Sequence, residues 1–166
     1  MTKETYLKMT QPFRDKPKLA KSLHMVNDIL TGIIFASYPL LILWLFVRKD
    51  PLLLKTILIP LNGFIVVTDL RRMINRERPY EKFETPPLIP KNTKGKSFPS
   101  RHVFSAAVIA LTVFMQPQLV SAGVLFFIFA IAIGVIRVLS GVHYISDVLA
   151  AFAFAAAVWG IGYYLF

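Results

Sequence analysis

Long apolar runs separated by polar stretches, all but one of them short, make up the chain from residue 29 onward. Each run approaches the roughly 20 residues that a helix needs to cross a bilayer. We therefore predict an all-α fold, a polytopic transmembrane helical bundle of about five spans. The predicted spans are residues 29–47, 51–68, 103–115, 119–136 and 148–166.

The third run is the shortest of the five. Its 13 residues would form only about 20 Å of helix, so we expect the helix to begin earlier, near Pro99. The sequence Gln-Pro-Gln at 116–118 separates this run from the next, and Pro117 cannot continue a helix. The third and fourth spans are therefore expected to be antiparallel neighbours.

Two longer polar segments lie outside the runs. Residues 1–23 contain Pro12 and Pro17 and are predicted to lie at the membrane interface. The apolar run that follows them is predicted to be a retained membrane anchor and not a cleaved signal peptide. Residues 69–101 form the only long polar connection and are predicted to be an active-site loop. The chain is then a single membrane-integral domain, 1–166, whose alternating spans place 1–23, 69–101 and 137–147 on one face of the membrane.

Composition supports a membrane setting. The chain is 55% hydrophobic, and its mean hydropathy is +0.58. Its net charge of +10 predicts contact with anionic headgroups or with an anionic substrate, so the expected partners are membrane lipids and not nucleic acid. The absence of Cys excludes disulfides and thiolate catalysis. Nothing in the pattern indicates an oligomeric state.

Polar residues with phosphate chemistry gather on the shared face. Arginine presents a planar fork that matches phosphate oxygens, so Arg71, Arg78 and Arg137 are candidate phosphate ligands. Arginines that flank spans also act as interfacial anchors, and a histidine at a helix start is often only a cap. The joint occurrence of three such segments favours a site over anchoring.

Two histidines and a carboxylate complete a candidate catalytic set. His143 and Asp147 lie four residues apart, which at helical spacing lets the carboxylate fix the imidazole of a nucleophile. His102, on another helix, can protonate a leaving oxygen and later deprotonate water. The backbone amides of Ser100 and Arg101 open the third helix and are expected to face the phosphate.

At these residues the sequence resembles the type 2 phosphatidic acid phosphatase superfamily, membrane lipid phosphatases that share an active site with vanadium haloperoxidases. The family pattern is Lys, six residues, Arg-Pro; then Pro-Ser-Gly-His; then Ser-Arg, five residues, His, three residues, Asp. The matching positions are Arg71, Arg78 and Pro79 for the first motif, Pro99, Ser100, Arg101 and His102 for the second, and Arg137, His143 and Asp147 for the third.

The resemblance implies a role for each of these residues. His143 would be the nucleophile, Asp147 its partner and His102 the acid and base. The phosphate pocket would comprise Arg71, Arg78, Ser100 and Arg137, with Arg101 as an added cation. No metal and no other cofactor is implied.

Three positions depart from the family pattern. Arg71 replaces Lys and keeps the charge but not the geometry, and Arg101 stands where a Gly lets the backbone approach phosphate. Ile136 replaces the usual Ser and removes a hydroxyl. The family commonly has six spans, and here the polar segment 1–23 stands in place of the first.

The resemblance and the charge pattern predict different orientations. We count 16 of the 19 Lys and Arg residues on the active-site face, which favours a cytoplasmic site. Family members of bacterial membranes that process lipid phosphates mostly face outward. On the resemblance we assign the site to the outer face of a bacterial cell membrane, against the charge bias.

The predicted function is hydrolysis of a lipid phosphate or diphosphate through a phosphohistidine. Phosphatidate, phosphatidylglycerol phosphate and undecaprenyl diphosphate all fit as substrates, because the apolar residues of the spans do not distinguish among them. The alternative is a non-catalytic anionic-lipid binder or small transporter that retains the pocket. Haloperoxidase chemistry on bound vanadate is a minor third interpretation, disfavoured by the membrane setting.

Overall fold

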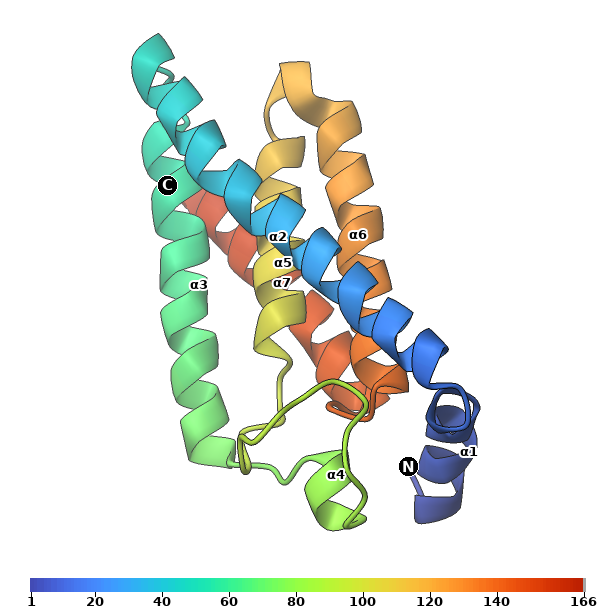
Figure 1. Ribbon diagram of the computed structural model, residues 1–166. Helices are drawn as coiled ribbons and strands as arrows, with labels where there is room; N and C mark the ends of the chain where they lie inside the picture. The colour runs from blue at the N-terminus through green and yellow to red at the C-terminus, as the bar shows by residue number, and fades with distance from the viewer. Residues whose placement is uncertain (166) are drawn as a thin grey trace.

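The computed structural model describes residues 1–165, and within them every regular element is helical. The α-helices are α1 (Lys3–Arg14), α2 (Pro17–Arg48), α3 (Leu53–Ile74), α4 (Pro79–Lys82), α5 (Arg101–Phe114), α6 (Val120–Leu139) and α7 (Ile145–Leu165). A 3₁₀ turn, η1 (Pro117–Leu119), joins α5 to α6. The fold is a bundle of long helices with α1, α4 and the α6–α7 turn gathered at one end (Figure 1).

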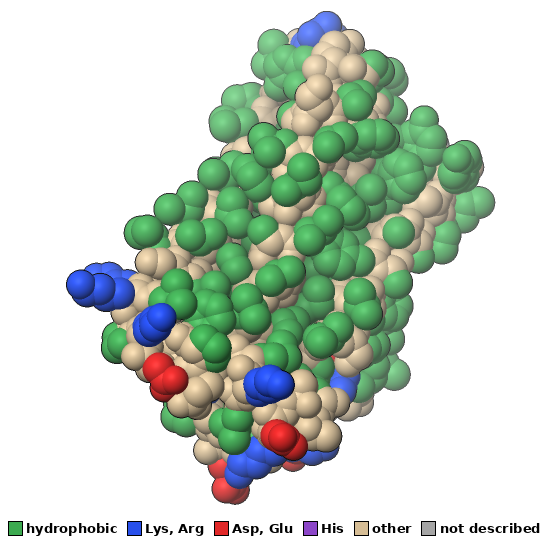
Figure 2. Space-filling model, turned by 90° about the vertical axis from the view of Figure 1, so that its right-hand side faces the viewer, with side chains coloured by type: hydrophobic (Ala, Val, Ile, Leu, Met, Phe, Trp, Pro, Cys, Tyr) green, Lys and Arg blue, Asp and Glu red, His purple; other side chains and the backbone are tan. Residues whose placement is uncertain are grey.

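By length and composition, four helical segments among the described residues can cross a membrane, and α5 is a shorter apolar helix. The surface agrees with a lipid environment, because large apolar side chains such as Leu40, Phe46 and Leu149 are exposed. Charged side chains gather mainly toward one end of the face shown in Figure 2, below a broad apolar surface. The predicted all-α, multi-pass membrane fold is confirmed.

The short helix α5 forms the centre of the bundle. It contacts α2, α3, α6 and α7, and most of its residues are buried. Small residues make this packing possible: a Cβ on Gly63 of α3 would lie 2.7 Å from the Phe104 ring of α5. Gly123 of α6 packs equally closely on the backbone of Phe114. As predicted, α5 begins before residue 103 and runs antiparallel to α6 across the Pro117 turn.

Helix α2 begins earlier than the apolar run indicated. Pro17 occupies its first turn, and the helix continues for 32 residues, about 48 Å, so it crosses the bundle diagonally (Figure 1). Residues 17–23, expected at the interface, are therefore the polar first turns of this helix. Helix α1 is the separate amphipathic element, capped by the Thr2 side chain.

The polar end is fixed by contacts between segments distant in sequence. Asn75 adopts a left-handed conformation that ends α3, and Gly141, with φ of +75°, turns the chain after α6. Tyr6 of α1 is buried against this second turn: a Cβ at Gly141 would lie 2.8 Å from Tyr6 Cε2. The ring of Tyr6 also packs on Phe83, 5.2 Å between centroids. Helix α1 thus covers the turn that carries His143.

Candidate active site

A small cationic pocket of about 50 Å³ lies at the polar end of the bundle. Its lining comprises Arg71, Arg78, Lys91, Thr93, Arg101, His102, Arg137 and His143. Six of the eight residues predicted from sequence therefore meet in one cavity, although they come from α3, α5, α6 and two connecting segments. Of the other two, Asp147 lies behind His143, and Ser100 caps α5 beside the pocket.

His143 is held with one ring nitrogen toward a carboxylate and the other toward an arginine. Its Nδ1 lies 3.4 Å from Asp147 Oδ2, and its Nε2 lies 3.5 Å from Arg78 Nη1. This network favours the tautomer in which Nδ1 carries the proton and the Nε2 lone pair faces the pocket. Burial lowers the pKa of His143 to about 4, an effect that the hydrogen bond to Asp147 opposes and the charge of Arg78 reinforces. The imidazole is therefore neutral at pH 7.

The sequence suggested that His143 and Asp147 lie on one helix. In the structure they do not. His143 lies in the turn before α7, and its amide donates to the carbonyl of Arg137 at 3.3 Å. Asp147 lies in the first turn of α7. The turn at Gly141 redirects the chain between the two helices and thereby brings the histidine back over the carboxylate.

Asp147 has further partners that the sequence motifs did not reveal. Its Oδ2 accepts hydrogen bonds from Ser97 Oγ at 2.5 Å and from the Tyr144 amide at 3.0 Å. Its Oδ1 accepts from Arg76 Nη1 at 2.8 Å, and the Arg76 guanidinium lies 4.1 Å from the centre of the Tyr144 ring. The sequence motifs singled out neither Arg76 nor Ser97. Because these partners lie 50 and 71 residues from Asp147, local spacing carried no signal for them.

Backbone carbonyls orient the two arginines of the first motif. Arg78 donates from Nε to the Gly95 carbonyl at 2.9 Å and from Nη1 to the Val142 carbonyl at 3.2 Å. Arg71 donates from Nη1 to the carbonyl oxygens of Ser97 and Pro99. Both side chains are buried, so these bonds fix the guanidinium planes that a phosphate would meet.

The start of α5 differs from the predicted anion cap in one respect. The Ser100 amide donates to the Asp147 carbonyl at 3.0 Å, so the prediction that it faces a phosphate is wrong. The Ser100 hydroxyl, in contrast, is buried and has no hydrogen-bond partner among residues 1–165. His102 occupies the first turn of α5, where its ring stacks on Phe35 of α2 with 6.5 Å between centroids.

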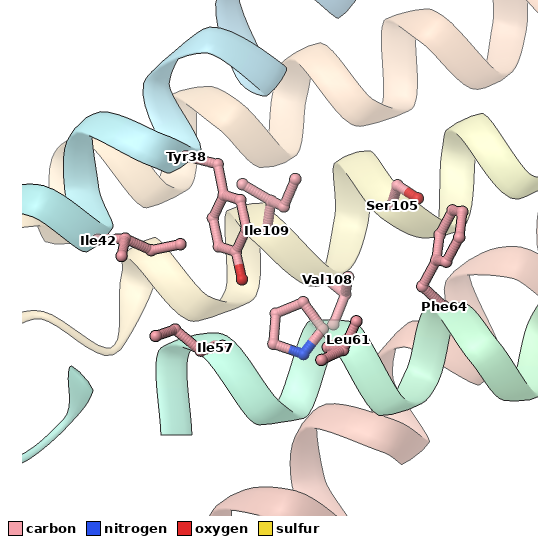
Figure 3. A pocket seen from close by; sticks show the side chains of 9 residues that line it. Tyr38, Ile42, Ile57, Leu61, Phe64, Ser105, Val108 and Ile109 are labelled. Carbon is pink, nitrogen blue, oxygen red and sulfur yellow. The ribbon is translucent and has the colours of Figure 1, made fainter. Parts of the chain in front are cut away.

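An apolar groove of about 280 Å³ runs between α2, α3 and α5 (Figure 3). Tyr38 and Ile42 reach into it from α2, and Ile57 and Phe64 line it from α3. The Phe64 ring also lies 5.4 Å from the guanidinium carbon of Arg101, which lines the cationic pocket. The groove and the pocket therefore adjoin at this contact, so that an apolar chain and an anionic head could be bound side by side.

Among residues 1–165, no group of three or more His, Cys, Asp or Glu side chains is placed to hold a metal ion. The positive charge in the pocket is supplied by side chains instead, which suits the binding of a phosphoryl group. A neutral imidazole pointing into such a pocket is a nucleophile for phosphorus, and a second histidine is available for proton transfer.

Comparison with known proteins gives a family and two related folds. The sequence model of the PAP2 superfamily matches residues 52–166. The crystal structure of Aquifex aeolicus LpxE is similar with a TM-score of 0.75 and 22% identity, over 97% of this chain and 93% of that one. A transmembrane PAP2-type phosphatidylglycerolphosphate phosphatase from Bacillus subtilis is similar with a TM-score of 0.60 and 24% identity, over 97% and 92%. No curated protein sequence matches significantly.

Proposed function

The chain belongs to the PAP2 superfamily, the type 2 phosphatidic acid phosphatases, and from this membership we propose that it hydrolyses a lipid phosphate or diphosphate through a phosphohistidine. The resemblance predicted from the three motifs is confirmed, and a membrane lipid phosphatase is the function that the membership supports. One observation carries the detailed proposal: His143 Nε2 faces a pocket lined by arginines from all three motifs.

In the proposed first step, His143 Nε2 attacks phosphorus and forms a nitrogen–phosphorus bond. The bond from phosphorus to the leaving oxygen breaks, and His102, which gains a proton when the anionic substrate binds, donates that proton to the leaving oxygen. Asp147 stabilises the imidazolium that forms, through Nδ1. Arg71, Arg78 and Arg137 neutralise the charge of the phosphoryl oxygens in the transition state.

In the second step, neutral His102 removes a proton from water, and the resulting hydroxide attacks the phosphorus of phosphohistidine. The nitrogen–phosphorus bond breaks, so that free phosphate and unmodified His143 are released. His102 ends protonated, ready for the next turnover. The apolar groove between α2, α3 and α5 would accept a hydrocarbon chain of the lipid, and its contact with Arg101 supports a lipid substrate.

The test is phosphate release from phosphatidate, phosphatidylglycerol phosphate and an isoprenyl diphosphate by the purified protein in detergent. His143→Asn should lower kcat by at least about a thousandfold and abolish phosphate label on the protein, because no other group replaces the nucleophile. His24→Asn is the matched control, since His24 pairs with Asp28 outside the pocket. If wild-type protein releases phosphate from none of these lipids, the non-catalytic lipid-binding alternative stands instead.

We propose further that the reaction needs no metal ion, because arginines supply the charge that a divalent cation supplies in other phosphatases. Activity should be unchanged in excess EDTA, and vanadate should inhibit by adopting the five-coordinate geometry of the transition state. Loss of activity in EDTA that magnesium restores would contradict this mechanism.

A further inference from the structure

Lys91 lines the pocket but belongs to none of the three motifs. It lies in the segment between α4 and α5, and hydrogen bonds hold that segment on both sides of it. The Leu88 amide donates to the Ser140 carbonyl at 3.0 Å, and the Gly95 amide donates to both carboxylate oxygens of Glu81. Tyr80 also donates to the Thr93 carbonyl. Lys91 is thus presented to the pocket by a fixed stretch of chain.

Burial divides the lining of the pocket, apart from the half-buried His102, into two sets. The inner set, Arg71, Arg78, Arg137 and His143, is at most 8% exposed and surrounds the position of the phosphoryl group that His143 would attack. The outer set, Lys91, Thr93 and Arg101, is partly or fully exposed. The outer set therefore lies where the group attached to that phosphoryl would emerge. A cavity of about 50 Å³ has room for little more than one phosphoryl group, so a larger anion must extend to the outer set.

The pocket carries more positive charge than a single phosphate requires. Four arginines and Lys91 line it, and the lining described within residues 1–165 includes no Asp or Glu. The structure has four ion pairs within residues 1–165, and none of them involves one of these five pocket cations. A phosphomonoester brings a charge of only about −1.5 to −2 at pH 7. The excess charge favours a substrate with a second phosphate close to the first.

We propose that Lys91 binds a second phosphate group, on the leaving-group side of the phosphoryl that is transferred, and so selects substrates that carry one. This inference rests on the proposed function. In a diphosphate ester the second phosphate is the leaving group itself; in phosphatidylglycerol phosphate it is the neighbouring phosphodiester. Both present the same anionic oxygens to the Lys91 ammonium, which Thr93 and Arg101 flank.

The electrostatic state of Lys91 agrees with this assignment. Partial burial lowers the pKa of Lys91, and the charges of Arg78, Arg137, Arg101 and Arg71 lower it further. An anion bound among these groups would relieve the repulsion and favour the charged ammonium. Lys91 is therefore poised to gain more from a bound phosphate than a solvated lysine would.

The kinetic test compares Lys91→Met with Lys94→Met, an exposed lysine of the same segment that does not line the pocket. Lys91→Met should lower kcat/KM about tenfold to a hundredfold on an isoprenyl diphosphate or on phosphatidylglycerol phosphate, and less than about threefold on phosphatidate. The substrate that loses more identifies the source of the second phosphate. Lys91→Arg should restore most of the loss, and Lys94→Met should change none of the three. An equal loss on all three lipids, or no loss, would overturn the proposal.

A second test does not depend on turnover. The wild-type protein is treated with an amine-reactive acylating reagent, and modification of Lys91 and Lys94 is followed by mass spectrometry. Methylenediphosphonate should protect Lys91 at concentrations at which inorganic phosphate does not, and neither should protect Lys94. Equal protection of Lys91 by both anions, or by neither, would count against the second phosphate site. Protection without any lipid phosphatase activity would reject the proposed function alone.

Discussion

Asp147 is the side chain on which the hydrogen bonds of the site converge. It is fully buried, and its two oxygens accept from Arg76, Ser97, His143 and the Tyr144 amide. A buried carboxylate with this many donors is fixed in position. Its oxygens both hold the neighbouring chain segments and orient His143, the proposed nucleophile. Within residues 1–165, Arg76 is the one donor to Oδ1, so Oδ2 remains directed toward His143.

Arg76 is therefore expected to position Asp147. Arg76→Ala should lower kcat about tenfold with little change in KM, because it leaves one oxygen of a buried carboxylate without its charged partner. Arg76→Lys should recover part of the loss. Arg72→Ala is the control, since Arg72 pairs with the exposed Asp69, and should stay within about twofold of wild type. A rise in KM alone would show that Arg76 acts on substrate binding instead.

The depressed pKa of His143 predicts how its reactivity depends on pH. A pKa lowered to about 4 means that the imidazole stays neutral as the pH falls below 6.5, where an ordinary histidine becomes charged. Modification of His143 by diethyl pyrocarbonate, which requires the neutral ring, should therefore remain fast at pH 5.5 and decline only toward pH 4. Mass spectrometry at His143, with a histidine peptide as reference, measures the midpoint. A midpoint near 6.5 would contradict the burial of the ring.

At this scale the sequence identified six of the eight residues that line the pocket, but neither Lys91 and Thr93 nor the partners that hold the site. The motif positions were predictable because their side chains must be of fixed type for phosphate chemistry. Ser97 and Arg76 act through contacts across 50 and 71 residues, which no local spacing encodes. The Ser100 amide was assigned wrongly for the same reason, since its acceptor is the distant Asp147 carbonyl.

Among the elements, hydropathy predicted the membrane helices well and the polar ends poorly. The runs at 51–68 and 119–136 differ from α3 and α6 by a few residues, because lipid demands an apolar stretch of fixed length. Helix α2 begins at Pro17, well before its apolar run, because polar residues continue a helix as readily as apolar ones once outside the lipid. Helix α1 and its contact with the α6–α7 turn were not predicted.

Because that contact covers the turn that carries His143, we expect α1 to support the proposed activity. Tyr6 is 1% exposed and lies against Gly141, Phe83 and Tyr144. Tyr6→Ala should create a cavity, loosen the turn that carries His143, and lower kcat at least about tenfold. It should also make residues 1–16 more sensitive to limited proteolysis. Lys8→Ala, at an exposed position on the same helix, should change neither measurement. Normal activity with increased proteolysis would show that α1 is dispensable for the site.

For the molecule as a whole, cations are concentrated at the end that holds the pocket. Several of these residues line the phosphate site or, as Arg76 does, pair within it, so their number does not report orientation alone. Charge counting treats each Lys and Arg as a signal for the cytoplasmic side, whereas in the proposed function part of the excess binds the substrate. The proposed outward orientation of the site therefore requires a direct test.

The absence of cysteine from the sequence makes this test simple. Lys94→Cys places a thiol on the exposed segment beside the pocket, and Gln118→Cys places one on the exposed turn between α5 and α6, at the other end of the bundle. With an outward-facing site, a membrane-impermeant maleimide should label Lys94→Cys in intact cells and Gln118→Cys only after permeabilisation. The reverse pattern would place the site in the cytoplasm, as the charge bias predicts.

The five cations that line the pocket have no acidic partners there, and this affects the stability of the folded chain. Like charges held together in a partly buried cavity raise the free energy of the empty protein, whereas an anion bound only by the folded form lowers it. By mass action, an anion at a hundred times its dissociation constant adds about 2.7 kcal/mol to the free energy of unfolding. Phosphate, the final product of the proposed reaction, would then act as a chemical chaperone, and the fold would be most robust where its product accumulates.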